Sequence, residues 1–171
     1  MRLFIAVEPS PDFRAALADL QTRLKAAGIG GRFLDPSNLH LTLAFIGEWQ
    51  EDMTAVLPAV DEPFPLTLSS LGIFPRAKVL WAGVRSSQEL DALAMLVRER
   101  LDSAKIPYDH QSFNPHITLI RKPVLPEDDV LSAVQIPPAS MIVRETCLYQ
   151  SDHGAEGMKY TVIGRSGNSF I

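Results

Sequence analysis

The sequence has a single cysteine, Cys147, and this scarcity excludes several kinds of site. One cysteine forms no internal disulfide bond, and it cannot build a zinc site that relies on several cysteine ligands. Cys147 lies in the segment Thr-Cys-Leu-Tyr, whose alternation is typical of a strand. We therefore expect a small core residue here rather than a catalytic thiol.

Long hydrophobic runs are lacking as well. No apolar stretch approaches the roughly 20 residues that a membrane-spanning helix needs. The N-terminal run Leu3–Val7 is too short for the core of a signal peptide, and Glu8 and Pro9 interrupt it. We expect a cytoplasmic protein without membrane segments, in which residues 2–8 form a buried first strand.

An excess of positive charge is the third absence. The chain has 16 Lys and Arg against 20 Asp and Glu, so its net charge is −4 at pH 7. A protein that coats nucleic acid through many phosphate contacts is normally basic. This charge favours an enzyme that binds one phosphate or one chain end. The length of 171 residues suits one domain, and we expect a monomer.

Apolar periodicity predicts a mixture of helices and strands. Helical spacing predicts helices over residues 10–27 and 87–104, and a serine begins each of them. Shorter helices are expected near 51–60 and within the proline-rich segment 123–138. Strands are predicted at 2–8, 38–46, 64–74, 79–84, 115–121, 140–150 and 158–165, with a turn at 152–154 before the last one.

One unit of strand, helix and strand occurs twice, in residues 2–46 and 79–121. Each unit ends in a His-X-Thr strand. His40 and His116 each lie 30 residues after the serine that begins the helix of the unit, Ser10 or Ser86 (40 − 10 and 116 − 86). The repeat predicts that the whole chain is a single domain, residues 1–171, of two similar lobes related by an approximate two-fold axis.

The two His-X-Thr motifs carry the candidate catalytic residues. Because successive side chains of a strand point to opposite faces, His40 and Thr42 share a face, and so do His116 and Thr118. A two-fold axis would set two imidazoles across a cleft, with two hydroxyls at its floor. In-line displacement at phosphorus needs one group that removes a proton and one that donates a proton, and histidine titrates near neutrality. The hydroxyls would donate to phosphate oxygens.

Other interpretations of the two histidines are weaker. A single histidine in an apolar strand is usually structural, but two copies in register within a repeat favour catalysis. A zinc site needs three or four ligands. Neither strand has an acidic residue near its histidine on the same face, and His110 and His153 lie in polar, loop-like segments. We therefore expect no metal, and the absence of a Gly-X-Ser-X-Gly motif argues against a serine hydrolase.

These motifs resemble the two-histidine (2H) phosphoesterase superfamily, in its LigT-like branch of RNA 2′,3′-cyclic phosphodiesterases, also called 2′-5′ RNA ligases. The resemblance implies an α+β fold of two lobes, each an antiparallel sheet with helices on its outer face, and a cleft between the lobes. It covers nearly the whole chain and rests on Arg-Leu-Phe-Ile-Ala-Val at 2–7, Asn-Leu-His-Leu-Thr-Leu at 38–43 with Phe-Ile-Gly at 45–47, Leu-Gly-Ile-Phe-Pro at 71–75, Val-Leu-Trp-Ala-Gly-Val at 79–84, Phe-Asn-Pro-His-Ile-Thr-Leu at 113–119 and Leu-Tyr-Gln-Ser at 148–151.

The resemblance also implies an activity, the hydrolysis of RNA 2′,3′-cyclic phosphate ends to 2′-phosphates without metal or nucleotide cofactor. His40 is then the general acid that protonates the departing 3′ oxygen, and His116 is the general base that activates water. Thr42 and Thr118 bind the phosphate. An RNA 5′-hydroxyl in place of water would give a 2′-5′ linkage. Another cyclic phosphate, a 2′-5′ oligonucleotide, or a non-catalytic role in binding nucleotides or RNA ends stays open.

Further residues are candidates for substrate contacts. Phe45 and Arg121 each follow their histidine by five residues, and they could stack on a base and meet a phosphate. Strict alternation places both on the face opposite the histidines, so these roles require a bulge or a strand end. Otherwise they are a core phenylalanine and a rim arginine. Tyr149 and Ser151 are similar candidates.

Two further sets of residues are interpreted more simply. Asn38 and Asn114, each two residues before a histidine, are expected to be strand-entry or turn residues. Local positive charge would come from Arg32, Arg76 and Lys78.

Overall fold

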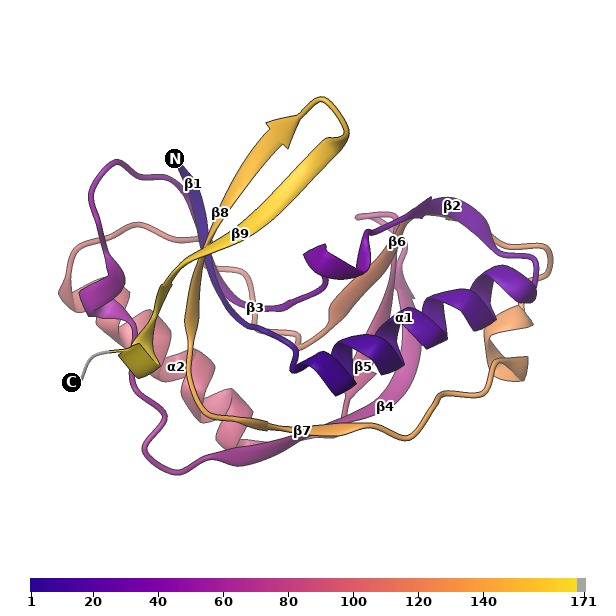
Figure 1. Cartoon of the computed structure of the whole chain (residues 1–171), viewed down its shortest axis with the longest axis horizontal. Coiled ribbons are helices and arrows are strands. Elements are labelled where there is room, and N and C mark those ends of the chain that lie inside the picture. The colour runs from indigo at the N-terminus through magenta and orange to yellow at the C-terminus, as the bar shows by residue number, and fades with distance from the viewer. Residues whose placement is uncertain (169–171) are drawn as a thin grey trace.

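The computed structural model describes residues 1–168, and nine strands of this part form two antiparallel sheets (Figure 1). The first sheet has four strands in the order β3 (Leu41–Glu48), β1 (Arg2–Val7), β8 (Cys147–Gly154) and β9 (Gly157–Arg165). The second sheet has five strands in the order β2 (Gly30–Phe33), β6 (Ile117–Val124), β5 (Val79–Val84), β4 (Phe64–Phe74) and β7 (Ser140–Val143).

Two α-helices begin at serine caps. The hydroxyl of Ser10 accepts a hydrogen bond from the N–H of Phe13 at the start of α1 (Pro11–Ala26), and Gly28 follows the helix with a left-handed φ of 93°. The cap of α2 (Gln88–Ser103) is Ser87, which accepts from the N–H of Leu90. The expectation that Ser86 begins this helix was therefore wrong by one residue. The buried face of α2 starts at Leu90, which places the cap three residues earlier.

Each helix covers the sheet of the other half (Figure 1). Helix α1 follows β1 of the first sheet, yet its Gln21 side chain donates hydrogen bonds to the carbonyls of Leu34 (2.9 Å) and Leu119 (3.0 Å), the latter in β6. Helix α2 follows β5 of the second sheet and contacts β3. Both helices and the inner faces of both sheets bury their leucines in one continuous core. The halves therefore share a core rather than each having its own.

The α+β class and the two antiparallel sheets confirm the predicted fold, and β4 and β5 have the predicted bounds. The strand expected at 140–150 is two strands in different sheets, because the chain leaves the second sheet after β7 and enters the first at β8. The turn before β9 lies at 155–156 rather than 152–154, since pairing continues to Gly154 and Gly157.

Some of the smaller elements also differ from the predicted ones. The segment near 51–60 has only a short 3-10 helix, η2 (Thr54–Val56), close to Pro58. Strand β2 was not predicted, because two of its four residues are glycines that hide any alternation. Two further 3-10 helices lie elsewhere, η3 (Val130–Ala133) inside the proline-rich segment, as predicted, and η4 (Ser166–Asn168) after β9. Among the described helices, none has both the length and the apolar character needed to cross a membrane.

Candidate active site

Both motif histidines lie immediately before a strand, at the place where the two sheets meet. His40 precedes β3 and follows the 3-10 helix η1 (Pro36–Asn38), while His116 precedes β6. Strands β3 and β6 contact each other across the boundary between the sheets. A cavity of about 560 Å³ opens there, and its lining includes His40, Thr42, His116 and Thr118. The two predicted motifs thus face one cavity.

Each histidine ring is held by a backbone carbonyl two residues earlier. Nδ1 of His40 lies 2.7 Å from the carbonyl oxygen of Asn38, and Nδ1 of His116 lies 2.6 Å from that of Asn114. Because a carbonyl only accepts, the hydrogen-bond pattern assigns the proton of each neutral ring to Nδ1. Each ring then has Nε2 as its free acceptor, the atom that can exchange a proton with a substrate.

His40 stands among aromatic rings. The ring of Phe4 lies 4.6 Å from it, and the ring of Tyr160 meets it edge-on at 5.2 Å. Burial is the main cause that lowers the pKa of His40 to about 4, the hydrogen bond to Asn38 opposes this shift, and the positive charge of Arg121 adds to it. His40 is therefore neutral at pH 7 while the cavity holds no anion.

Asn38 does more than end a turn. Its side-chain amide donates to the carbonyl of Met158 (2.9 Å) and accepts from the N–H of Tyr160 (3.1 Å), so it pairs with β9 as a neighbouring strand would. Its own carbonyl orients His40. Sequence reasoning expected a strand-entry or turn residue and missed this second role. The available signal was the asparagine at the same place before both histidines.

A bulge in β3 turns Phe45 to the side of the histidine. Thr42 pairs with Ala6 and Ala44 pairs with Ile5, so Leu43 is an extra residue in the ladder. Leu43 and Ala44 are consecutive, yet both are buried in the core. Phe45 is consequently on the same side as Thr42, 52% exposed, and lines the cavity.

The same device occurs in β6. Thr118 pairs with Trp81 and Ile120 pairs with Leu80, which leaves Leu119 as the extra residue. Arg121 therefore shares the side of Thr118 and lines the cavity, where its Nη2 donates to the hydroxyl of Tyr160 at 3.4 Å. The bulges that roles for Phe45 and Arg121 require are both present.

The remaining candidates divide into two groups. Ser151 lines the cavity, but Tyr149 does not, because it is buried beneath Phe4 with the two rings stacked at 4.9 Å. A direct contact between Tyr149 and substrate is excluded in this arrangement. Residues that line the cavity without having been predicted are Arg2, Leu3, Phe4, Leu34, Ile46, Gly47, Asp109, Met158 and Tyr160, whereas Arg32, Arg76 and Lys78 lie outside it.

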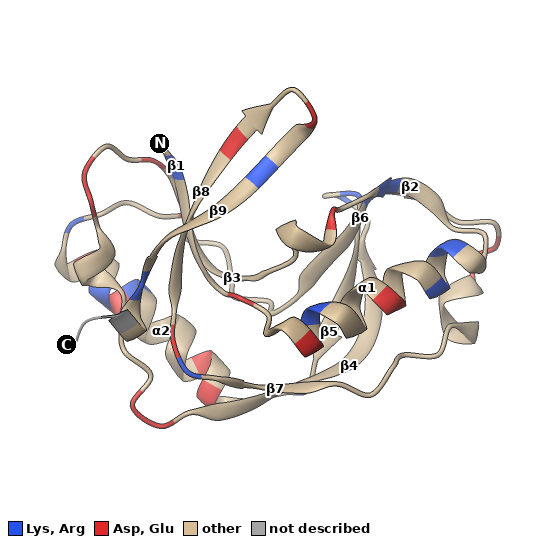
Figure 2. Cartoon of the chain, viewed as in Figure 1, with Lys and Arg blue, Asp and Glu red and all other residues tan. Residues whose placement is uncertain are grey.

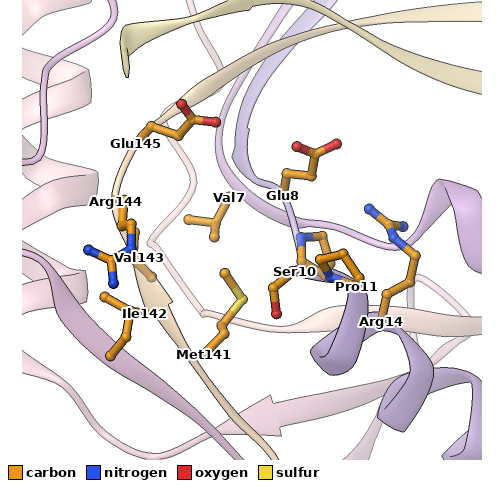
Figure 3. A pocket seen from close by; sticks show the side chains of 11 residues that line it. Val7, Glu8, Ser10, Pro11, Arg14, Met141, Ile142, Val143, Arg144 and Glu145 are labelled. Atoms are coloured by element: carbon orange, nitrogen blue, oxygen red, sulfur yellow. The ribbon is translucent and has the colours of Figure 1, made fainter. Parts of the chain in front are cut away.

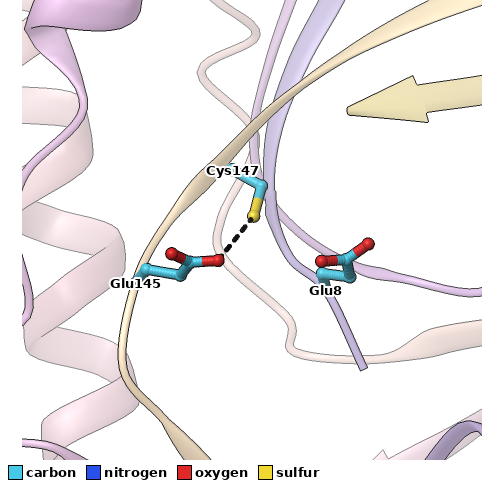
Figure 4. A group of neighbouring side chains, drawn as sticks. All are labelled: Glu8, Glu145 and Cys147. Carbon is cyan, nitrogen blue, oxygen red and sulfur yellow. Dashed lines mark hydrogen bonds between the residues drawn. The ribbon is translucent and has the colours of Figure 1, made fainter. Parts of the chain in front are cut away.

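A second cavity, of about 670 Å³, lies between the start of α1 and the segment from β7 to β8 (Figure 3). Neither motif histidine lines it. Glu8 and Glu145 from its wall approach Cys147, and their ligand atoms all lie within 4.8 Å of one another (Figure 4). Nη1 of Arg165 donates to Glu8 at 2.6 Å and to Glu145 at 2.7 Å. One guanidinium thus pairs with both carboxylates of this cluster and ties the ends of β1 and β9 to the start of β8.

Cys147 itself is fully buried. Burial raises the pKa of its thiol to about 12, which keeps it protonated and unreactive, as expected of a core residue.

Comparisons with known proteins agree with this geometry. The RNA 2′,3′-cyclic phosphodiesterase of Escherichia coli strain K12 is 32% identical over 174 residues, which cover 96% of this chain and 94% of that protein. The RNA 2′,3′-cyclic phosphodiesterase of Thermus thermophilus is 31% identical over 95% of this chain and 88% of its own length. The crystal structure of E. coli LigT in apo form superposes with a TM-score of 0.76 at 31% identity and covers 96% of this chain and 95% of LigT.

The family model described as the 2′-5′ RNA ligase superfamily matches residues 9–155, which include both His-X-Thr motifs and both bulges. With two histidines held alike in one cavity and relatives that align along nearly the whole length, the chain belongs to the 2′-5′ RNA ligase superfamily.

Proposed function

We propose that this protein is an RNA 2′,3′-cyclic phosphodiesterase that opens cyclic phosphate ends of RNA to 2′-phosphates. The observation that carries the proposal is the pair of histidines, His40 and His116, each with its Nδ1 bound to a carbonyl and its Nε2 left free beside a shared cavity. Relatives that share about 30% of the sequence have this name, and E. coli LigT has been crystallised with 3′-AMP and with ATP.

In the proposed reaction, Nε2 of His116 removes a proton from water as the water oxygen attacks phosphorus. The bond between phosphorus and the 3′ oxygen breaks, and His40 donates a proton to that oxygen, so the product is a 2′-phosphate with a free 3′-hydroxyl. Thr42, Thr118 and Arg121 donate to the non-bridging oxygens, which bear the negative charge. The exposed ring of Phe45 stacks on the base, and Ser151 lines the same cavity.

The proton on His40 needs a source of stabilisation. Its pKa of about 4 disfavours the charged form. A bound phosphodiester places a negative charge beside the ring and opposes both the field of Arg121 and the cost of burial, which raises the pKa of His40. The low pKa of His40 favours the reverse assignment, in which neutral His40 is the base and His116 the acid. Substrates with different leaving groups separate the two assignments.

The proposed function is tested with a 2′,3′-cyclic mononucleotide and an RNA with a cyclic end, with the product identified by phosphorus NMR. We expect a 2′-phosphate, and equal rates with and without excess chelator, because the proposed chemistry uses only protein groups. A 3′-phosphate product would contradict the assigned leaving group. A large loss in chelator that zinc restores would contradict the metal-free reaction.

The same assay addresses the other proposed properties. Addition of an RNA with a 5′-hydroxyl should yield some 2′-5′ linkage, because the hydroxyl takes the place of water. Turnover of another cyclic phosphate or of a 2′-5′ oligonucleotide in preference to the cyclic RNA end would point to that substrate instead. We also propose that the enzyme acts as a monomer in the cytoplasm, which size-exclusion chromatography and cell fractionation test.

A further inference from the structure

Trp81 lies next to the active site, on the outward side of the second sheet. Its neighbours in β5, Leu80 and Ala82, are fully buried in the core, so the indole points to the opposite face. Trp81 pairs directly with Thr118 of β6, and directly paired residues share a face. The indole therefore stands one strand, about 5 Å, outward from a threonine that lines the cavity.

Two glycines leave room for the indole to lie flat on the sheet. A Cβ atom at Gly72 of β4 would collide with the indole of Trp81, and a Cβ atom at Gly83 of β5 would come within 2.9 Å of it. Neither glycine has a positive φ, so the backbone does not require glycine at these positions. Glycine inside a strand weakens the strand and often marks a close approach by another group. At Gly72 that group is the indole, and at Gly83 the hydroxyl of Ser70 comes closer still than the indole.

A ring that lies flat on a sheet turns its other face outward. Trp81 is only half-buried, and the ring of Phe74 continues the aromatic surface at 5.1 Å from it. Phe74 in turn meets the ring of His116 edge-on at 4.9 Å. The indole N–H has no hydrogen-bond partner among the residues described, so hydrogen bonding does not account for a tryptophan at this position. Phe74 thus lies between Trp81 and His116, and the three rings form one row.

Positive charge accompanies this row. The turn at 75–78 follows Phe74 and includes Arg76 and Lys78, and the carbonyl of Lys78 accepts from the N–H of Lys122 at 2.8 Å. Neither Arg76, Lys78 nor Lys122 takes part in an ion pair within residues 1–168. Figure 2 shows basic residues at β2 and at the neighbouring end of β6. In a chain of net charge −4, these cations next to half-buried aromatic rings suit a polyanion with flat bases.

We propose that Trp81 and Phe74 form a stacking platform for a second nucleobase, adjacent to the nucleotide that carries the cyclic phosphate, and that Arg76 and Lys78 meet the phosphates of the same strand. This inference rests on the proposed function and narrows its substrate class. The preferred substrate is the end of a single-stranded RNA rather than a free cyclic mononucleotide.

The first test compares two substrates with the same cyclic end, a mononucleotide and a short single-stranded RNA. Stacking on an aromatic side chain contributes about 1–3 kcal/mol per base, so Trp81→Leu should lower the RNA-to-mononucleotide ratio of kcat/KM by roughly tenfold or more. Trp81→Phe should retain most of the ratio. Trp49→Leu is the matched control, and it should leave the ratio unchanged. Equal losses on both substrates would overturn the platform.

The second test does not depend on catalysis. The chain has two tryptophans, so Trp49→Phe leaves Trp81 as the only fluorescent indole. Titration with a single-stranded RNA that ends in a 2′-phosphate should quench this fluorescence, and the corresponding mononucleotide should not. An unquenched signal at saturating RNA would overturn the inference. If the wild-type protein hydrolyses neither substrate, the proposed function fails, while quenching by RNA still supports the platform.

The third test addresses the cations. The double variant Arg76→Ala, Lys78→Gly removes two charges, and glycine suits the φ of 54° at position 78. Fewer phosphate contacts release fewer counterions, so KM for the RNA should rise and should depend less steeply on salt concentration. An unchanged salt dependence for RNA would remove these two residues from the proposed surface.

Discussion

The halves around His40 and His116 use the same local design in different surroundings. Each imidazole donates from Nδ1 to the carbonyl of the residue two positions earlier. The strand that follows each histidine has a bulge, which places the fifth residue after the histidine, Phe45 or Arg121, on the same side as the histidine. Yet His40 is enclosed by Phe4, Tyr149 and Tyr160, whereas His116 has the edge of Phe74 beside it. One motif therefore gives two histidines with different surroundings, because strands β8 and β9, which provide Tyr149 and Tyr160, extend only the first sheet.

The registers of the two halves differ as well, although β1 pairs with β3 as β5 pairs with β6. Phe4 and Trp81 occupy matching places in the repeated sequences. Phe4 pairs with Phe45 and is buried under His40, whereas Trp81 pairs with Thr118 and stays partly open. We propose that the halves arose by duplication. A shift of the strand pairing then placed the two matching aromatic residues, Phe4 and Trp81, in different environments.

The largest effects are expected from the histidines. His116→Ala and His40→Ala should each lower kcat/KM for a cyclic nucleotide by several orders of magnitude, because the two histidines act together in one proton-transfer mechanism. With an activated nitrophenyl phosphodiester, His40→Ala should recover part of its loss, because that leaving group needs less protonation. His116→Ala should not recover. Recovery of His116→Ala alone would reverse the roles, and equal recovery would mean that the roles are not divided.

Intermediate effects are expected from the two threonines. Each hydroxyl provides a hydrogen bond rather than a proton, so Thr42→Ala and Thr118→Ala should lower kcat by about tenfold to a thousandfold. Thr→Ser should retain most activity in either position. A pair of alanine variants as inactive as the histidine variants would show that the threonines do more than donate to the phosphate.

The two asparagines should differ in stability. Asn38→Ala removes both hydrogen bonds to β9 and should lower the free energy of unfolding by about 1–3 kcal/mol. The side chain of Asn114 is exposed, so Asn114→Ala should change stability by less than about 0.5 kcal/mol. Urea denaturation of both variants measures the difference. Similar values for the two would contradict the assigned docking of β9.

The smallest effect concerns pH. The pKa of His40 is lowered to about 4 on folding, so the folded state favours the neutral ring. This contribution to stability is fully present above the unfolded pKa of about 6.5, and it is lost as the pH falls from there towards 4. Wild type should therefore lose on the order of 2 kcal/mol more than His40→Asn between pH 7.5 and 4.5. Parallel losses in urea titrations would show that His40 is not desolvated.

Sequence reasoning was most successful where a local period sets the outcome. The alternation in Leu-His-Leu-Thr and Pro-His-Ile-Thr correctly predicted that His and Thr share a face, since leucine and isoleucine turn to the core. The bulges at Leu43 and Leu119 could be stated only as a requirement, because Gly47 and Pro123 nearby permit a break without fixing its place. The role of Asn38 depends on β9, some 120 residues away, and no local pattern encodes that contact.

The arrangement of the helices lay equally beyond local patterns. The apolar stripes of α1 and α2 indicate that each helix covers a sheet, but they do not indicate which one. That choice depends on contacts such as Gln21 with Leu119, between residues far apart in the sequence. The split of 140–150 into β7 and β8 has the same origin, since both parts are apolar and only the tertiary pairing separates them.

The packing of each helix on the sheet of the other half makes the two halves depend on each other for folding. Because α1 covers the second sheet and α2 covers the first, a fragment such as residues 1–77 would expose the apolar face that the other fragment covers. Neither fragment should fold alone, while the two mixed together should restore the native circular dichroism by complementation. Both helices also link the two halves, because each contacts a strand of the other half. The separation of the two catalytic rings therefore depends on the core that the two halves share, so substitutions in that core, far from the cavity, should alter catalysis.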